Sequence, residues 1–285
     1  SGHALTSGWS LRVTASTGPA WRAGLPPPIA ERLRRYVPPV VVFVLGLVLW
    51  QIFYTGGGFF RPIPTPTEIA DAAVREWGVL STAARATLIE ALGGLAIGTT
   101  AGLTVGFLTA RWAIARDILL PLAIGASTIP IIAVAPILNN WFGVLNPISK
   151  MLMAALLVFF PVVIAVTRGL VEVKAGHVEL MRSYAADDTL ILRKVRVPNM
   201  LPFFFTALKV GTTLAFIGAI VGEFFGGTPT VLGQVVINRI SNGQFDVAWA
   251  AIILGAAAAI IAYAIVTLVE RWMIPWYFHL HDDPV

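Results

Sequence analysis

The chain of 285 residues contains no cysteine, so neither a disulfide framework nor a thiolate metal site is available to it. Charge is also scarce, because only 12% of the residues are Asp, Glu, Lys or Arg whereas 57% are hydrophobic. That balance leaves too little polar surface for a soluble domain of this length. The signatures H-E-x-x-H, G-x-S-x-G and G-x-x-x-x-G-K-[ST] do not occur. We therefore expect an integral membrane protein without catalytic activity of its own.

The hydrophobic runs are long enough to cross a bilayer as helices. A hydrocarbon core about 30 Å thick takes roughly 20 helical residues, and the runs are too long and too unalternated for membrane-barrel strands of roughly 10 residues. We therefore expect an all-α polytopic membrane protein. Six transmembrane helices are predicted, at residues 37–54, 87–110, 118–138, 148–170, 202–222 and 247–269.

The distribution of positive charge predicts the orientation of these spans. An even number of crossings puts both termini on one side, and a cytoplasmic placement assigns 14 of the 20 Lys and Arg residues to that side, against five outside. Most of the net charge of +5 therefore comes from Lys and Arg residues next to the ends of the predicted spans, and it does not indicate a nucleic-acid partner. We expect a transmembrane domain at 37–276, a flexible cytoplasmic tail at 1–36 and a second tail at 277–285. The histidines of the second tail, His279 and His281, are expected to be solvated and not metal-bound.

Glycine, proline and threonine mark three local features. Four glycines recur at every fourth position of the second span and predict a smooth face for close helix packing. Thr65-Pro-Thr-Glu68 has the spacing of a capping box and predicts a short external helix. Prolines in the third and fourth spans predict kinks, which either line a cavity or serve ordinary packing. The glycines are Gly94, Gly98, Gly102 and Gly106, and the prolines are Pro121, Pro130, Pro136 and Pro161.

The segment between the fourth and fifth spans, at about 171–201, is too charged to cross a membrane and too patterned to be a plain linker. Leu180 and Tyr184 lie four residues apart and would share one face of a short helix. Since the chain has no loop for ATP phosphates, a separate energy-supplying subunit would need such an exposed element to bind. The alternative is an amphipathic loop without a partner.

A motif in this segment resembles the cytoplasmic EAA loop of ABC importer permeases, which reads E-A-A, three residues, G, nine residues, I-x-L-P. The matching residues are Glu179-Leu-Met-Arg-Ser-Tyr-Ala185 and, after nine more, Val195-Arg-Val-Pro198. Glu179 and Pro198 are identical to the pattern, whereas Ala185 replaces the usual Gly. Because Ala resists positive φ, we expect a helical turn at Ala185 instead of a sharp left-handed one.

The resemblance extends over about residues 37–276 and is to permeases of the nitrate, sulfonate, taurine and bicarbonate type. Ile63-Pro-Thr-Pro66, Ile129-Pro-Ile-Ile-Ala-Val-Ala-Pro136 and Val221-Gly-Glu-Phe-Phe-Gly226 look like successive family motifs. The resemblance implies a type I ABC importer permease fold in a bacterial plasma membrane, with both termini in the cytoplasm. It further implies a second permease chain in a homodimer, cytoplasmic ABC ATPase subunits, an extracytoplasmic solute-binding protein and surrounding membrane lipid. No cofactor or metal is implied.

The same resemblance assigns residues of the loop to ATPase coupling. These residues are Glu179, Ser183, Tyr184, Ala185, Ala186, Asp187 and Pro198. The cargo would be a small polar solute, of the sulfonate, nitrate and bicarbonate type or of the pyrimidine and vitamin-precursor type. Glu223-Phe-Phe-Gly-Gly227 resembles the pyrimidine or vitamin-precursor branch and slightly favours it. The alternative function is a secondary transporter or channel that works without nucleotide.

Polar residues within or at the ends of spans are candidates for the translocation pathway, because ionisable groups in a membrane are costly unless they serve a function. We select Glu90, Asn139, Asn140 and Glu223. Three of these residues also have a simpler interpretation: Glu90 can sit in headgroup water, and the two asparagines can anchor a helix in the interface.

Overall fold

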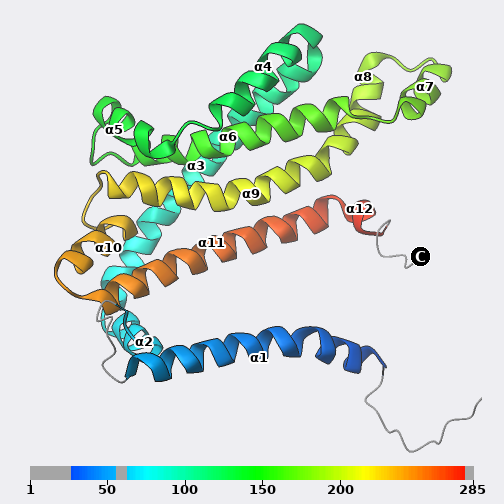
Figure 1. The fold of residues 1–285 in the computed structure, drawn as a ribbon. Coiled ribbons are helices and arrows are strands. Elements are labelled where there is room, and N and C mark those ends of the chain that lie inside the picture. The colour runs from blue at the N-terminus through cyan, green and yellow to red at the C-terminus, as the bar shows by residue number, and fades with distance from the viewer. Residues whose placement is uncertain (1–26, 56–62, 280–285) are drawn as a thin grey trace, which may run out of the picture. The chain divides into compact units, whose positions relative to one another are not determined.

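The computed structural model describes residues 27–55 and 63–279, and the remaining parts of the two predicted tails, 1–26 and 280–285, lie outside this description (Figure 1). Every regular element in the two described ranges is helical, which confirms the expected all-α class. The helices are α1 (Pro27–Thr55), α2 (Pro66–Arg75), α3 (Trp77–Arg111), α4 (Ala113–Ala126), α5 (Ile131–Phe142), α6 (Pro147–Val171), α7 (Ala175–Ser183), α8 (Asp188–Ile191), the π-helix η1 (Leu192–Arg196), α9 (Val197–Phe224), α10 (Leu232–Ser241), α11 (Phe245–Met273) and α12 (Pro275–His279).

The chain divides after Phe53 into two compact units. The first contains most of α1, in which Val37–Tyr54 has the length and hydropathy of a membrane span. Because α1 begins at Pro27, residues 27–36 of the predicted tail are helical. The second unit contains α2 to α12, and its packing is described below.

Five helices of the described ranges are long and apolar enough to cross a membrane, and a sixth crossing is formed if α4 and α5 count as one broken span. The sequence predicts one kinked helix at 118–138, whereas the structure has two helices that meet at 95°. The break falls just before Pro130, which stands at the N-cap of α5. A residue before proline is disfavoured in the helical conformation, so a helix ends here more readily than it bends.

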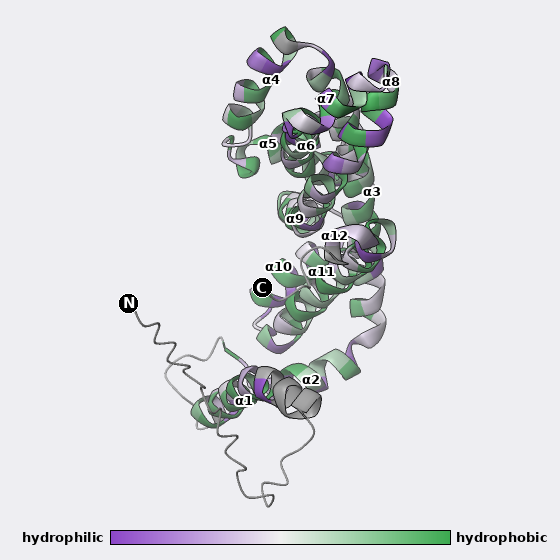
Figure 2. Ribbon diagram, turned by 90° about the vertical axis from the view of Figure 1, so that its right-hand side faces the viewer, coloured by the Kyte–Doolittle hydropathy of each residue, from purple (hydrophilic) through white to green (hydrophobic). Residues whose placement is uncertain are grey.

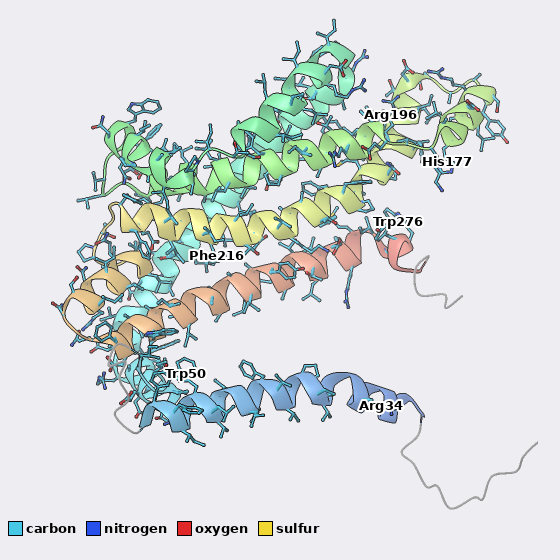
Figure 3. The ribbon with its side chains drawn as sticks, in the orientation of Figure 1. Arg34, Trp50, His177, Arg196, Phe216 and Trp276 are labelled. Carbon is cyan, nitrogen blue, oxygen red and sulfur yellow. The ribbon has the colours of Figure 1, made fainter. Side chains whose placement is uncertain are left out.

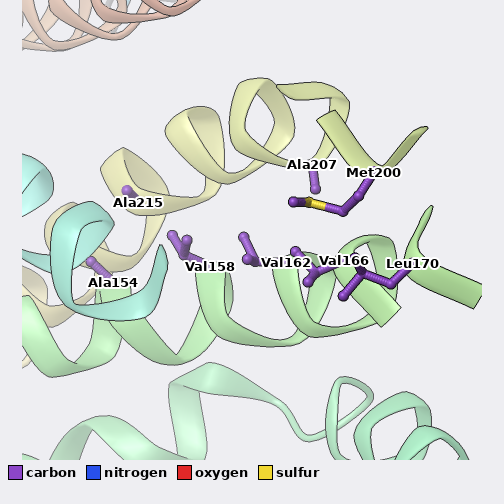
Figure 4. Packing of buried hydrophobic residues seen from close by; sticks show 8 residues of the cluster. All are labelled: Ala154, Val158, Val162, Val166, Leu170, Met200, Ala207 and Ala215. Carbon is purple, nitrogen blue, oxygen red and sulfur yellow. The ribbon is translucent and has the colours of Figure 1, made fainter. Parts of the chain in front are cut away.

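The core of the second unit is formed by α3, α6 and α9. Valines at every fourth position of α6 pack against small and sulfur-containing residues of α9 (Figure 4). The cluster contains Ala154, Val158, Val162, Val166, Leu170, Met200, Ala207 and Ala215. This spacing follows one face of a helix, so the two helices stay in contact over most of their length.

The glycine stripe of α3 packs against α6, as the sequence predicts. Gly94, Gly98, Gly102 and Gly106 are all buried. A Cβ atom added at Gly98 would lie 2.5 Å from the carbonyl oxygen of Ala155, which shows how closely the two backbones approach. Small residues allow such an approach, and van der Waals contact then replaces the hydrophobic effect that is missing within a membrane.

We expect Gly98→Ala to lower the free energy of unfolding by about 1 to 3 kcal/mol, because the new methyl group forces α3 and α6 apart. The measurement is the midpoint of unfolding in an SDS titration of the purified protein. Gly125→Ala is the matched control, since a Cβ there meets nothing within 4 Å. Equal midpoints for the two variants would contradict the close packing of α3 on α6.

Short helices close one end of the bundle. The predicted capping box is present, with the Glu68 backbone N–H donating to Thr65 Oγ1 at 3.3 Å and the Thr65 N–H donating to Glu68 Oε2 at 2.7 Å. Helix α10, which the sequence analysis did not anticipate, lies at the same end of the second unit as α2 (Figure 1). Ion pairs of Arg75 with Asp246 at 2.8 Å and Arg239 with Glu76 at 3.0 Å tie these short helices to their neighbours.

Helices α7, α8 and α12 lie at the opposite end of α6, α9 and α11 (Figure 1). Hydrophilic residues gather around α7 and α8, whereas the long helices are largely hydrophobic (Figure 2). The bundle thus has an end that carries the α6–α9 loop and an end that carries α2, α5 and α10.

Candidate functional site

The α6–α9 loop projects from the bundle as α7, a turn, α8 and η1. None of the residues of α7 is buried. Leu180 and Tyr184 have 56% and 76% of their surface exposed, which is unusual for large hydrophobic side chains outside a membrane span. Both side chains of the predicted face are therefore uncovered in the single chain.

The turn after α7 differs from the prediction, because Ala185 has a φ of +56°. The Ala185 N–H donates to the carbonyl of Arg182 at 2.9 Å and the Ala186 N–H donates to the carbonyl of Met181 at 3.1 Å. This pair of bonds is the Schellman arrangement that ends helices at a left-handed residue. The prediction of a helical turn at Ala185 was wrong, because these two bonds outweigh the steric resistance of its Cβ.

The next helix begins immediately after this turn. The Asp187 side chain accepts a hydrogen bond from the Leu190 N–H at 2.9 Å and caps α8. Of the other residues assigned to coupling by resemblance, Glu179 and Ser183 lie on α7, and Pro198 lies in the first turn of α9. The loop therefore has a defined shape, in which four residues separate the end of α7 at Ser183 from the start of α8 at Asp188.

We expect Ala185→Gly to stabilise this turn by about 1 kcal/mol, because glycine adopts positive φ without a steric penalty. Hydrogen exchange of the backbone amides of residues 175–191 should slow in this variant. Ala186→Gly is the control, since its φ is not positive, and it should accelerate exchange by adding freedom to the unfolded loop. Faster exchange in Ala185→Gly would show that the turn is not left-handed.

A buried polar cluster lies at the other end of the bundle, around Glu223 near the end of α9. Glu223 is fully buried. Its Oε1 accepts a hydrogen bond from Thr87 Oγ1 at 2.6 Å, and its Oε2 accepts one from the Gly233 N–H at 2.6 Å. The Leu232 N–H donates in turn to Thr87 Oγ1 at 3.0 Å, and Gln234 Nε2 donates to the Glu223 carbonyl at 2.6 Å. These bonds attach the start of α10 to α3 and α9.

Glu90 and Lys150 complete this cluster. Glu90 lies one helical turn after Thr87, and it is close enough to Glu223 and Lys150 for electrostatic interaction. Its Oε2 is buried and has no hydrogen-bond partner. Lys150 Nζ donates to the carbonyls of Val144 and Asn146, and it lies near enough to both carboxylates for electrostatic interaction, although no ion pair of Lys150 occurs within the described residues. We refer to Thr87, Glu90, Lys150 and Glu223 as the Glu223 cluster.

The structure brings together two of the four predicted pathway residues, Glu90 and Glu223. Asn139 is buried on α5 and its two side-chain amide atoms have no partner, whereas Asn140 is exposed. Lys150 was assigned only a topological role by the sequence analysis. Its position in the first turn of a span, three residues after Pro147, is the signal that marks a cation at a membrane boundary.

A cavity of about 930 Å³ lies between α6 and α9, toward the end that carries the loop. Its walls include Phe203 and Tyr277, and Arg168 provides hydrogen-bond donors. Pro161 and Pro202 also line it, so each wall helix lacks one backbone N–H here. The predicted link between prolines and a cavity therefore holds for Pro161. An apolar cavity with a few polar groups suits an organic molecule better than a small inorganic ion.

Lys209 does not add a free cation to this region. Its Nζ is 2.8 Å from Glu270 Oε2 in an ion pair that joins α9 to α11. Both side chains are largely buried. Figure 3 labels one or two side chains on several of the helices: Arg34 and Trp50 on α1, His177 on α7, Phe216 on α9 and Trp276 on α12.

Comparison with known proteins gives consistent matches. Residues 94–275 match the family model of the binding-protein-dependent transport system inner membrane component. The formylaminopyrimidine transport permease protein ThiX of Halalkalibacterium halodurans is 29% identical over 249 residues, which cover 86% of this chain and 98% of ThiX. The riboflavin transport system permease protein RibX of Chloroflexus aurantiacus is 31% identical over 261 residues, which cover 87% of this chain and 95% of RibX.

The fold also resembles a solved structure. A chain of the MetNI methionine ABC transporter in an inward-facing conformation matches with a TM-score of 0.58 and 19% sequence identity. The match covers 70% of this chain and 97% of the MetNI chain. At this identity the likeness supports the fold alone.

Proposed function

The chain belongs to the family of binding-protein-dependent transport system inner membrane components, and from this premise we propose that two copies form the pathway of an ABC importer that is coupled to its ATPase subunits through the α6–α9 loop. The protein is the permease subunit of such an importer. The observation that carries the proposal is the exposed face formed by Leu180 and Tyr184 on a loop of defined shape. The loop would lie in the cytoplasm, together with both termini.

The junction of the loop with the bundle supports its role as a lever. Asn199 Nδ2 at the start of α9 donates to the carbonyls of Gly169 at 2.8 Å and Glu172 at 3.3 Å at the end of α6. A Cβ added at Gly169 would lie 2.6 Å from Met200 Cα, so the two helices touch through their backbones here. Displacement of α7 by a bound ATPase subunit would therefore move α6 and α9 together.

This movement of α6 and α9 as one unit would open and close the passage that the two copies form. We infer alternating access: closure of the ATPase subunits on ATP moves the loops, the permease opens toward the solute-binding protein, and hydrolysis resets it. The residues of this chain transmit force and form the passage, and the ATPase subunits carry out the hydrolysis. In each transport cycle, the ATPase subunits thus move the α6–α9 loop, and the helices attached to the loop open and close the passage.

The cavity supports a planar heteroaromatic solute of the pyrimidine or vitamin-precursor type as cargo. Two relatives, ThiX and RibX, are named for formylaminopyrimidine and riboflavin. The volume of about 930 Å³ far exceeds that of nitrate or bicarbonate, and Phe203 and Tyr277 offer aromatic surface. Lys150 and Lys209 both interact with carboxylates, which makes them poor sites for an inorganic anion.

We expect Tyr184→Asp to weaken binding of the ATPase subunit about thirtyfold and to reduce ATP-driven uptake by at least about tenfold, because exposed aromatic residues dominate protein interfaces. Co-purification with the ATPase subunit and uptake into proteoliposomes measure the two effects. Ala175→Asp is the matched control, since Ala175 is exposed on the same short helix and its spacing from Leu180 places it on the opposite side from the Leu180 and Tyr184 face. If both variants bind the ATPase subunit like the native chain, the proposed coupling face is incorrect.

A secondary transporter is the second candidate, and the buried carboxylates Glu90 and Glu223 favour it because intramembrane carboxylates form proton relays. Uptake of an aminopyrimidine, a flavin and an alkanesulfonate should be compared in proteoliposomes that contain the complete complex. Uptake that requires ATP and persists after an ionophore collapses the ion gradients supports the importer. Uptake that ignores ATP but stops with the ionophore supports the alternative.

A further inference from the structure

A second cavity, of about 670 Å³, lies behind the α6–α9 loop where it meets the end of α3. Three arginines from three elements line it: Arg111 is the last residue of α3, Arg182 belongs to α7, and Arg196 is the last residue of η1. We call this cavity with its three arginines the arginine pocket. Arg196 is labelled at the base of the loop in Figure 3.

The charge of the arginine pocket is unbalanced. Asp188 is the one carboxylate among the residues that line it, which gives a formal charge of +2 from three arginines and one aspartate. Within residues 27–55 and 63–279, none of the three arginines forms an ion pair. Guanidinium groups bind phosphate oxygens in a bidentate manner, so a pocket with three of them is suited to a phosphate group.

Apolar residues form much of the remaining wall of the arginine pocket. Leu108 on α3 and Leu192 on η1 line it, and both side chains remain accessible. Arg111 ends an apolar span, and this is the depth at which a transmembrane helix meets lipid headgroups. A ligand that is anionic at one end and apolar at the other would satisfy both kinds of wall, which free phosphate or an acidic protein segment would not.

We propose that the arginine pocket binds the phosphate group of an anionic phospholipid from the inner leaflet, with its acyl chains along Leu108 and Leu192. Basic pockets between transmembrane helices on the cytoplasmic side bind anionic headgroups in this way. The bound lipid joins α3 to α7 and η1, so it holds the α6–α9 loop against the bilayer. The site is independent of the Leu180 and Tyr184 face and goes beyond the proposed function.

The test is binding of phosphatidylglycerol to the purified full-length chain, followed by native mass spectrometry, with phosphatidylcholine and inorganic phosphate as separate arms. The variant with Arg111→Gln, Arg182→Gln and Arg196→Gln should bind phosphatidylglycerol on the order of 100-fold more weakly, at about fivefold per arginine. The matched control has Lys174→Gln, Arg193→Gln and Lys194→Gln, which remove the same charge from the same loop but lie outside the pocket. This control should change binding by less than about threefold.

A single substitution tests the sign of the effect without removing any arginine. Asp188→Asn should strengthen phosphatidylglycerol binding by about fivefold, because it removes the carboxylate that opposes the headgroup. Equal binding of phosphatidylcholine, or equal losses in the two triple variants, would overturn the proposal. Phosphate binding as tight as that of phosphatidylglycerol would overturn the role of the acyl chains. Loss of the ATPase subunit from the arginine variant with intact lipid binding would assign the arginines to the protein partner.

Discussion

Replacing Glu223 with alanine is expected to lower the free energy of unfolding by about 3 to 5 kcal/mol and to detach α10 from the bundle. The carboxylate accepts hydrogen bonds from Thr87 Oγ1 and the Gly233 N–H, both at 2.6 Å, and Lys150 lies near enough to interact with it electrostatically. Its removal leaves a buried hydroxyl, a buried backbone N–H and a less compensated ammonium group. Leaving a buried charge without its partner is among the largest single effects known in proteins.

Two measurements check this prediction. An SDS titration gives the unfolding midpoint, and hydrogen exchange at Leu232 and Gly233 reports whether α10 is still attached. Glu90→Gln is the matched control, because Glu90 is buried in the same cluster but its Oε2 has no hydrogen-bond partner to lose. We expect that control to change stability by less than about 1 kcal/mol. A Glu90→Gln variant as unstable as Glu223→Ala would contradict this prediction, because it would show that the two carboxylates contribute equally to stability.

Replacing Lys150 with methionine is expected to lower the free energy of unfolding by about 3 to 5 kcal/mol, since it keeps the volume of the side chain but removes the cation that lies near two buried carboxylates. Lys150 is 1% exposed, so water cannot substitute for the lost ammonium group. The carbonyls of Val144 and Asn146 would also lose their donor. Unfolding in SDS is again the measurement.

A double-mutant cycle separates the charge effect from a general loss of packing. Adding Glu90→Gln to Lys150→Met removes one of the two uncompensated carboxylates and should recover about 1 to 3 kcal/mol. Adding Gly125→Ala, in α4 and with open space around it, should recover nothing comparable. Additive effects of Lys150→Met and Glu90→Gln would mean that the two side chains do not interact in the folded protein.

Hydropathy predicted the membrane spans well, because it sums the hydrophobicity of residues that are neighbours in the sequence. The helices α3, α6, α9 and α11 all contain the expected spans, although their ends extend beyond them. The same method missed α10, a helix of 10 residues between two spans. Its position depends on hydrogen bonds to Thr87 and Glu223, which belong to distant helices.

The two predicted sites differ in how far the sequence could describe them. The loop motif is contiguous, so spacing alone located Tyr184 and Ala185 between two spans. The positive φ of Ala185 was missed because steric preference was the only available argument, whereas the fold supplies two hydrogen bonds that impose the turn. At the Glu223 cluster, the sequence identified Glu90 and Glu223 as unusual but gave no reason to connect them with Lys150.

The sequence by itself determined that this chain spans a membrane with helices, where the spans lie, and which loop resembles a coupling element. These properties depend on local composition, and scarce charge together with long apolar runs admits few other structures. The tertiary structure decided which polar groups meet. Thr87 and Glu223 are 136 positions apart, and their contact exists because α3 and α9 bury both, so that each must satisfy its hydrogen bonds with the other.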